Sequence, residues 1–301
     1  MNLSSAELIL PPKGTLVFLS DIHKDSESFD YDSWESDKQL ILSMEDPQIL
    51  INGDIGSWIF PNDPRFRGKN GMKFYQSYLN TVKRDFADFI SELVPYIKGI
   101  GRGNHETSII RYNGYDIVAD LISYLNTFRE PDDPIVDLGY TGYIGLNFEV
   151  PNVSDIQKVL YYHHGAGGSA PVTGGAIDLQ RLSASHRADI YWIGHKHVKT
   201  VRGYTTIDYD WRKHAPVKRN IIGFITPGYD GDIKHIVPTD INGENPVYYD
   251  SDWATERMYS AQPQGFSYAF YETIRERHGK NRNNSKKKLR FSLVTPTIME
   301  G

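Results

Sequence analysis

Short apolar runs alternate with segments of helical spacing in the first half of the chain. Residues 14–20, 48–51 and 94–100 are continuous apolar runs, which are typical of strands covered on both faces. Apolar residues recur at helical spacing between residues 74 and 93, and a shorter helix is predicted over residues 33–44. We therefore expect a sheet with helices packed on it.

From residue 135 onward the predicted strands follow one another closely, which indicates a second sheet. Strands are predicted at residues 135–138, 140–150, 158–162, 189–193, 201–209 and 219–226, and helices at residues 118–128 and 176–185. Residues 55–72 mix Pro, Gly and aromatic side chains and are expected to form a long loop. Residues 246–270 are aromatic and irregular, and residues 275–290 are basic and run into a predicted closing strand.

The composition limits the chemistry that the protein can use. The chain has 301 residues, 39% of them hydrophobic, which is enough to bury a large core in one domain with additions. A net charge of -5 argues against a broad, nonspecific nucleic-acid surface but allows a local basic patch. Because the chain has no Cys, any metal must be held by His, Asp, Glu or Asn.

The N-terminal residues 1–14 do not look like a targeting signal. They lack a basic start, and Pro11 and Pro12 interrupt their short apolar stretch. The sequence also has no apolar run long enough for a membrane span. We therefore predict a soluble protein without a membrane partner that acts in the cytoplasm, either of its own cell or of a cell hosting a virus. The sequence leaves the oligomeric state open.

Residues that can bind metal ions follow five of the predicted strands. These residues are Asp21 and His23, Asp54, Asn104 with His105, His163 with His164, and His195 with His197. The carboxyl ends of strands in an open sheet line a common crevice, so these side chains can converge. A carboxylate has two oxygens, so Asp54 alone can bridge two cations. Nitrogen and oxygen donors without sulfur suit Mn, Fe, Zn or Ni better than Ca or Mg.

Two neighbouring cations explain why such a cluster would exist. A pair of cations about 3.5–4 Å apart lowers the pKa of a shared water, orients it in line with phosphorus and neutralises charge on the phosphoryl oxygens. His105, next to a metal ligand, can then protonate the departing oxygen. This chemistry predicts hydrolysis of a phosphate ester by a metal-bridging hydroxide, without a covalent intermediate.

Five short motifs occur in a fixed order between residues 21 and 197. They are Asp21-Ile22-His23, Gly53-Asp54, Gly103-Asn104-His105-Glu106, His164-Gly165 and Gly194-His195-Lys196-His197. This ordered set resembles the calcineurin-like metallophosphoesterase superfamily. The resemblance implies an α/β (α+β) fold, a four-layer αββα sandwich of two mixed β-sheets flanked by helices. It also implies two divalent metal ions, preferably Mn, at the C-terminal ends of the strands.

The resemblance also assigns roles to individual residues. It implies that Asp21, His23 and His197 hold one metal, that Asn104, His164 and His195 hold the other, and that Asp54 bridges the two. His105 would be the acid that protonates the leaving oxygen. His163 competes with His164 for one ligand position, and His164 is favoured because the family's His usually precedes a Gly.

The chain departs from the protein Ser/Thr phosphatase branch of this family. Arg102 before Gly-Asn-His-Glu looks like that branch, which carries Asp and Arg three and four residues after the bridging Asp. Here those positions hold Ser57 and Trp58, so the carboxylate expected to orient His105 is missing. Residues 164–168 look closer to bacterial and phage members, including nuclease-like ones. Arg102 is either a phosphate clamp or part of a structural ion pair.

These observations predict a metallophosphoesterase domain over residues 1–245, with an insertion loop at about 55–72, and a C-terminal extension over residues 246–301 packed on it. We expect a phosphodiester or phosphomonoester substrate. Nucleic acid or a nucleotide is favoured because of the basic segment at 275–290 and the aromatic residues Trp58, Phe60 and Phe66. The alternatives are a phosphomonoesterase or protein phosphatase, a metal-bound scaffold, and a nucleic-acid-binding module with little catalysis.

Overall fold

The computed structural model describes most of the chain. The described residues are 3–26, 28–60, 62–64, 76–168, 173–230, 264–277 and 285–296. Several features singled out in the sequence lie outside them. These are Phe66 with most of the second half of the 55–72 loop, residues 246–263 of the aromatic segment, and residues 278–284 of the basic segment.

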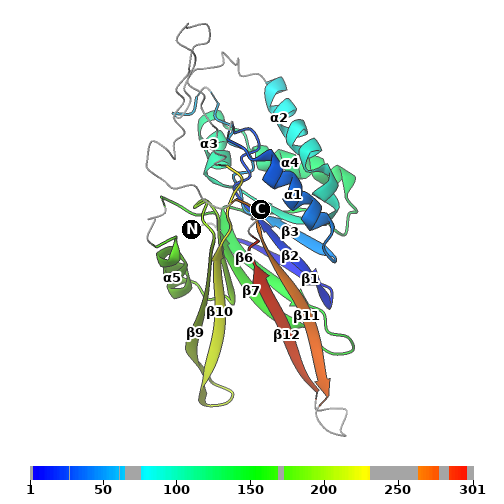
Figure 1. The fold of residues 1–301 in the computed structure, drawn as a ribbon, viewed down its shortest axis with the longest axis vertical. Coiled ribbons are helices and arrows are strands. Elements are labelled where there is room, and N and C mark those ends of the chain that lie inside the picture. The colour runs from blue at the N-terminus through cyan, green and yellow to red at the C-terminus, as the bar shows by residue number, and fades with distance from the viewer. Residues whose placement is uncertain are drawn as a thin grey trace, which may run out of the picture.

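Four neighbouring strands that reach one edge of the first sheet are parallel, and the other edge is an antiparallel hairpin (Figure 1). In spatial order the strands are β12 (Ser285–Val294), β11 (Ser267–Arg277), β2 (Lys13–Leu19), β3 (Pro47–Ile51), β4 (Ile97–Gly101) and β5 (Val136–Gly139). β11 runs antiparallel to β2, with Ser267 opposite Phe18 and Glu272 opposite Lys13. The described part of the C-terminal extension is therefore built into this sheet.

The second sheet mixes parallel and antiparallel pairs. In spatial order its strands are β1 (Ser4–Leu10), β6 (Thr141–Phe148), β7 (Ile156–His163), β8 (Ile190–Ile193), β10 (Ala215–Ile225) and β9 (Thr200–Asp210). Side chains alternate along β6, where Ile144, Leu146 and Phe148 are buried and their neighbours are partly exposed. The buried side of β6 faces the first sheet.

Helices cover the outer faces of the two sheets unequally (Figure 1). On the side of the first sheet lie α1 (Tyr31–Leu42), α2 (Gln76–Phe89), α3 (Asn104–Asn113) and α4 (Ile117–Leu125), with 3-10 turns at Ser91–Tyr96 and Asn126–Phe128. The second sheet carries α5 (Ala176–Ser185). Asp30 and Asp116 cap α1 and α4 by accepting the backbone N–H groups of Ser33 and Ala119.

Three clusters of buried side chains correspond to the three interfaces between these layers. Val17, Ile49 and the α4 residue Leu121 belong to the cluster under the helices of the first sheet. Phe18 and Trp192 belong to the cluster between the sheets. Leu179 of α5 belongs to the cluster on the outer side of the second sheet. The predicted four-layer sandwich of two mixed sheets flanked by helices is confirmed.

The structure corrects several predicted elements. The 135–138 strand was assigned to the second sheet, but β5 pairs with β4 in the first sheet, because the helical connection between them returns to the same sheet in parallel. Pro95 lies in a 3-10 turn, so β4 begins only at Ile97. Strand β1 was not predicted, because its residues alternate in burial and two prolines follow it. Asn104 begins a helix rather than a loop.

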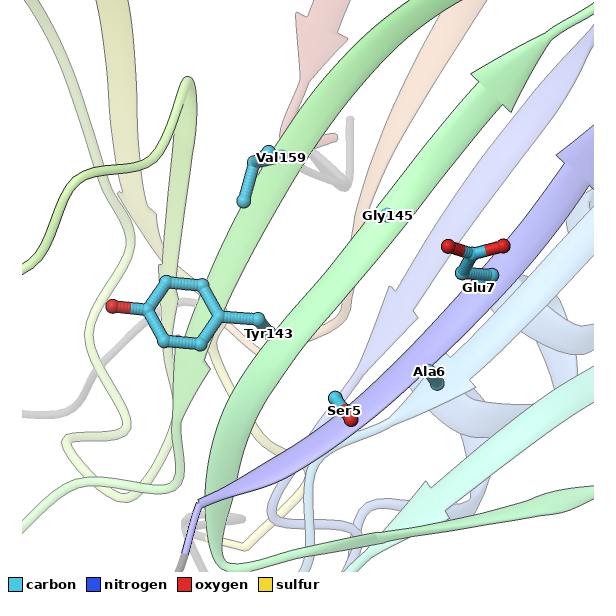
Figure 2. A pocket seen from close by; sticks show the side chains of 6 residues that line it. All are labelled: Ser5, Ala6, Glu7, Tyr143, Gly145 and Val159. Atoms are coloured by element: carbon cyan, nitrogen blue, oxygen red, sulfur yellow. The ribbon is translucent and has the colours of Figure 1, made fainter.

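Among the helices that the structure describes, none lies over part of the outer face of the second sheet. A shallow trough of ≈ 380 Å³ lies there across β1, β6 and β7 (Figure 2). It is lined by Ser5, Ala6, Glu7, Tyr143, Gly145 and Val159. None of these six residues belongs to the predicted metal ligands. Among the described residues, no helix has the length and apolar character needed to cross a membrane.

Replacing Trp192 by Ala should destabilise the protein by about 3–5 kcal/mol, since a large buried side chain leaves a cavity. Trp192 is 0% exposed, its ring centroid lies 5.0 Å from that of Phe18, and its Nε1 donates to Thr226 Oγ1 at 2.7 Å. Trp211 is 78% exposed, so Trp211→Ala should change stability by no more than about 0.5 kcal/mol. Urea unfolding measures the free energy of unfolding of both variants. An equal decrease in the two variants would contradict the packing of Trp192 between the sheets.

Candidate metal centre

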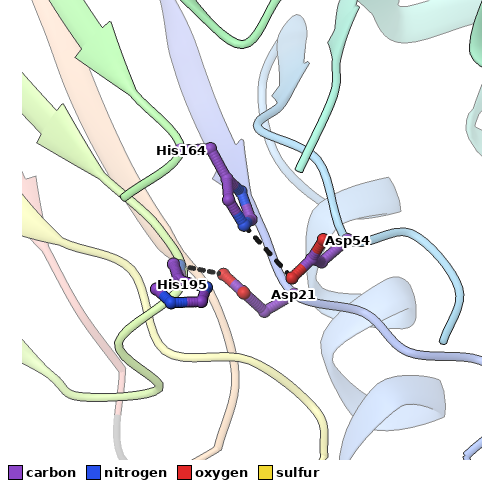
Figure 3. A group of neighbouring side chains, drawn as sticks. All are labelled: Asp21, Asp54, His164 and His195. Carbon is purple, nitrogen blue, oxygen red and sulfur yellow. Dashed lines mark hydrogen bonds and ion pairs between the residues drawn. The ribbon is translucent and has the colours of Figure 1, made fainter. Parts of the chain in front are cut away.

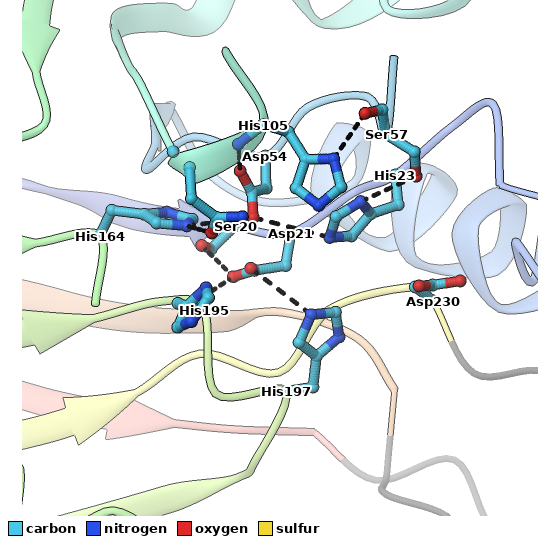
Figure 4. Close-up of polar contacts among 12 residues, drawn as sticks. Ser20, Asp21, His23, Asp54, Ser57, His105, His164, His195, His197 and Asp230 are labelled. Atoms are coloured by element: carbon cyan, nitrogen blue, oxygen red, sulfur yellow. Dashed lines mark hydrogen bonds and ion pairs between the residues drawn. The ribbon is translucent and has the colours of Figure 1, made fainter. Parts of the chain in front are cut away.

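The C-terminal ends of strands from both sheets bring the predicted ligands together (Figures 3 and 4). Asp21 and His23 follow β2, Asp54 follows β3, Asn104 begins α3 after β4, His164 follows β7, and His195 and His197 follow β8. Among the described residues, the ligand-type atoms of His and Asp form three overlapping groups, and within each group they lie within 4.8 Å of one another. The groups are Asp21, Asp54, His164 and His195; Asp21, His23 and His197; and His23, Asp54 and His105.

One oxygen of Asp54 lies between histidines from two different strands. Asp54 Oδ2 is 3.1 Å from His164 Nε2 and 3.8 Å from His23 Nε2. Asn104 Oδ1 is 3.2 Å from the same His164 nitrogen. On the other side, Asp21 Oδ1 is 3.6 Å from His197 Nε2. Asp54 Oδ2 thus faces imidazoles that come from both sheets.

Five of these residues have an unusual backbone conformation. Asp21, His23, Asp54, His195 and His197 have φ angles of 53°, 50°, 48°, 64° and 48°. Residues other than Gly seldom adopt this left-handed region, and they persist there only where surrounding contacts enforce it. The conformation turns the chain sharply just after each strand, which aims the side chain back across the strand ends.

Backbone hydrogen bonds and a close approach at Gly103 hold the loops after β2, β3 and β4 together. Asp21 N–H donates to Gly53 O at 3.0 Å, and His23 N–H donates to Asp54 O at 3.1 Å. His105 N–H donates to Asp54 Oδ1 at 2.9 Å. A Cβ on Gly103 would lie 2.1 Å from that same Asp54 oxygen, so only glycine fits there. The positions of the ligands are therefore fixed by the fold.

Glu106, for which no role was predicted, is central to this arrangement. Its carboxylate is fully buried and accepts three backbone N–H groups, from Gly103 at 2.7 Å, Asp54 at 2.9 Å and Ile55 at 2.8 Å. It therefore ties the β3 loop, which carries Asp54, to the start of α3, which carries Asn104. Burial, and then the neighbouring Asp54, raise the pKa of Glu106 to about 7.

The buried charges of the site are strongly coupled. Burial lowers the pKa of His164, but the facing Asp54 carboxylate outweighs this and raises it to about 10. Burial alone would raise the pKa of Asp54, but His164 and His105 hold it well below its usual range. Burial and then the neighbouring His105 lower the pKa of His23 to about 4. His164 and Asp54 thus form a buried ion pair beside a neutral His23.

The donor set fits divalent transition-metal ions. It combines imidazole nitrogens with carboxylate oxygens and one amide oxygen, without sulfur, which suits Mn, Fe or Zn. Within the described part of the chain, Asp21 Oδ1 is a buried carboxylate oxygen that accepts no hydrogen bond. A buried charged oxygen of this kind is costly unless a cation satisfies it. The site residues therefore fit bound metal ions.

His163 and His164, the two candidates for one ligand position, have different surroundings in this structure. His164 is fully buried and faces both Asp54 and Asn104. His163 Nδ1 instead accepts the backbone N–H of Gly165 at 2.8 Å, and His163 belongs to none of the three groups of candidate ligands. The geometry favours His164 as the ligand.

Arg102 is surrounded by carboxylates. Its Nε and Nη2 donate to Asp116 at 3.1 and 2.8 Å, and its Nη1 and Nη2 donate to Asp137. Both sides of the guanidinium are therefore occupied, and the contacts tie β4 to the start of α4 and to β5. The structural ion pair, one of the two roles open from the sequence, is favoured over a phosphate clamp.

Several residues of the site carried no signal in the sequence. The backbone oxygen of Ser57 accepts from His105 Nδ1 at 2.5 Å, and Ser57 Oγ lies 3.1 Å from His23 Nδ1. Asp230, more than 200 residues from His23, accepts from Ser26 Oγ at 2.6 Å and faces the side of the site occupied by His23 and His197 (Figure 4). Backbone contacts and such distant pairs leave no pattern that periodicity could reveal.

Lys196 also contributes to the site, and it lies between the candidate ligands His195 and His197 in the sequence. Its Nζ donates to the carbonyl oxygens of Ala166, Gly167 and Gly168 at 2.5, 2.8 and 3.1 Å. Asp178 Oδ2 lies 3.3 Å from the same nitrogen. The buried ammonium therefore holds the Gly-rich loop after His164 against the loop that carries His195 and His197.

Comparison with known proteins gives only distant structural likenesses. No family model and no curated protein sequence matches the chain. Vps29 from Chaetomium thermophilum is 10% identical, with a TM-score of 0.35 over 95% of this chain and 98% of that chain. A Vps29 double mutant from Entamoeba histolytica is 10% identical, with a TM-score of 0.33 over 92% and 99%. A metallophosphoesterase from Sphaerobacter thermophilus is 12% identical, with a TM-score of 0.32 over 93% and 88%.

Glu106→Gln should destabilise the protein by about 1–3 kcal/mol, because the amide group places a donor against a buried backbone N–H. Glu106→Ala removes the acceptor of all three N–H groups and should cost more. Glu130 is exposed, so Glu130→Gln is a matched control and should leave stability unchanged. Urea unfolding of the three variants measures this. A Glu106→Gln protein as stable as the control would contradict the structural role of Glu106.

Proposed function

We propose that the protein is a binuclear metal-dependent phosphoesterase that hydrolyses a phosphodiester or phosphomonoester bond. The observation that carries this proposal is the position of Asp54 Oδ2 between His164 and His23. A single buried carboxylate oxygen between two sets of nitrogen ligands is the arrangement that two neighbouring cations need. The strained backbone at five candidate ligands supports a functional role for the same cluster.

Each residue has a defined task in this proposal. Asp21, His23 and His197 would hold one cation, Asn104, His164 and His195 would hold the other, and Asp54 would serve as a ligand for both. When bound, the cations activate a water and neutralise charge on the phosphoryl oxygens, and Mn is the ion we favour. His105 donates its Nδ1–H to Ser57 O, so in the imidazolium form, with both ring nitrogens protonated, its Nε2–H would protonate the leaving oxygen.

The structure weakens the two features that favoured a nucleic-acid substrate. Trp58 and Phe60 are 5% and 2% exposed and belong to the core under the helices, so they cannot stack on a base. The basic strand β12 reaches Lys286 opposite Glu276, beyond the point where Glu272 pairs with Lys13 at the start of β2. That places Lys286 about 40 Å along the strands from Asp21. These lysines would bind nucleic acid only far from the bond being cleaved.

A metal-bound scaffold with little catalysis is the second candidate. The observation that favours it is the neutral partner of His105, a backbone carbonyl in place of the carboxylate expected at position 57. Hydrolysis assays separate the two functions. A protein that binds metal and cleaves none of a panel of nucleic acids, cyclic nucleotides, phosphopeptides and nitrophenyl esters would be such a scaffold.

The wild-type chain should bind two Mn²⁺ ions, because the Asp21, His23 and His197 group adjoins the group around Asp54, and Asp54 Oδ2 lies 3.8 Å from His23 Nε2. Asp54→Asn should lose at least one of them, since a neutral amide is a weaker ligand with a single oxygen. Asp132 is exposed, and Asp132→Asn should keep both ions. Calorimetric titration and elemental analysis after dialysis measure the stoichiometry. Two tightly bound ions in Asp54→Asn would contradict the shared position.

With Mn²⁺ added, the wild type should hydrolyse bis-para-nitrophenyl phosphate or para-nitrophenyl phosphate. Asp54→Asn should abolish turnover by disrupting the metal site. His105→Ala should lower kcat by about 10²–10⁴-fold on substrates with a basic leaving group while keeping the metal ions, since it removes a proton donor. Steady-state kinetics and metal analysis of the same samples provide the measurement. Undiminished hydrolysis in both variants would refute the proposed site.

A further inference from the structure

The turn formed by Gly56, Ser57 and Trp58 contacts two imidazoles of the site through different groups. The backbone oxygen of Ser57 accepts from His105 Nδ1 at 2.5 Å. The hydroxyl of the same residue lies 3.1 Å from His23 Nδ1. Figure 4 shows both rings directed toward this residue. The direction of the Ser57 carbonyl therefore decides how the His105 ring is held.

Asp25 fixes that direction from the neighbouring loop. Its two carboxylate oxygens accept the backbone N–H groups of Ser57 at 2.5 Å and Trp58 at 2.9 Å. The loops after β2 and β3 run side by side up to this point, and Lys24 N–H donates to Ile55 O at 3.3 Å. The Asp25 side chain continues this pairing by two more hydrogen bonds, so it sets the plane of the peptides on both sides of Ser57.

The turn is strained, and packing adds to the restraint. Trp58 has a φ of 38°, a left-handed value that costs energy for a bulky residue. Its indole is 5% exposed, and its ring centroid lies 6.1 Å from that of Phe86. A Cβ on Gly56 would lie 2.3 Å from Trp58 Cε2, so glycine is required for the indole to fold back. Without the Asp25 carboxylate, we expect this turn to relax.

We propose that Asp25 is the positioning residue for His105, acting through the Ser57 carbonyl. The proposal rests on the function given above, in which His105 protonates the leaving oxygen. A carbonyl oxygen can only accept a hydrogen bond, so it requires a proton on His105 Nδ1 whether the ring is neutral or charged. In the imidazolium form the second proton is on Nε2, and after that proton passes to the leaving oxygen the neutral ring keeps its proton on Nδ1. Asp25 does this without touching His105, and it takes the place of the missing acidic residue at position 57.

Asp25→Asn tests this assignment with esters of different leaving groups. The amide keeps one acceptor and places a donor against the second backbone N–H, so the turn should loosen. A general acid matters most when the leaving oxygen is basic. For phenyl phosphate esters we expect kcat/KM to fall about tenfold, and for 2,4-dinitrophenyl esters it should stay within about twofold of the wild type. The Mn²⁺ content should be unchanged.

Two further variants isolate the effect. Ser57→Ala removes the hydroxyl near His23 but keeps the carbonyl that contacts His105, so the ratio of the two esters should stay at the wild-type value. Asp155 is exposed, and Asp155→Asn controls for the loss of one negative charge. An Asp25→Asn protein that slows both esters equally, or neither, overturns the proposal. So does an altered ratio in Ser57→Ala.

A spectroscopic measurement tests the positioning without relying on turnover. Nitrogen-15 NMR of the zinc-loaded protein, at a pH where the His105 ring is neutral and with His105→Ala identifying the signal, should show His105 protonated at Nδ1 in the wild type and a mixture of tautomers in Asp25→Asn. An unprotonated Nδ1 in the wild type overturns the proposal. If the wild type hydrolyses no ester, the proposed function fails, and this spectrum still decides whether Asp25 positions the ring.

Discussion

The candidate site depends on one buried carboxylate, that of Glu106. It accepts backbone N–H groups from Gly103, Asp54 and Ile55 and so joins two loops that approach from different strands. Such a charge is costly in the interior unless donors surround it, and here three donors do. The same contact places a second negative charge, that of Asp54, close by, which His164 offsets from the opposite sheet. Glu106 thus both joins the two loops and sets the charge that surrounds Asp54.

The two sheets contribute unequal but complementary parts. The first sheet supplies Asp21, His23 and Asp54 on loops whose backbones are hydrogen-bonded to each other. The second sheet supplies His164, His195 and His197, with Lys196 binding the carbonyls of the Gly-rich loop. Because each sheet is rigid and the left-handed residues follow directly on the strands, little conformational freedom is left to the ligands before a cation binds.

The positions of the candidate ligands could be predicted from the sequence, but the neighbours of each strand and the contacts to backbone N–H groups could not. The ligand residues each follow an apolar run, so the sequence places them at strand ends, and parallel strands bring their ends to one edge. Strand β5 was placed in the wrong sheet because periodicity identifies a strand but not its neighbour. Asp25 and Glu106 act on backbone N–H groups, which every residue has, so their roles could not be read from residue types.

At position 57 a backbone carbonyl, and not an acidic side chain, contacts His105. A carbonyl fixes the tautomer and direction of His105 as a carboxylate would, but it contributes a dipole instead of a charge. The site already buries the carboxylates of Asp21, Asp54 and Glu106, and one more among them would add repulsion and a desolvation cost. The negative charge lies instead on Asp25, one peptide away from the ring, where the backbone N–H groups of Ser57 and Trp58 satisfy both of its oxygens.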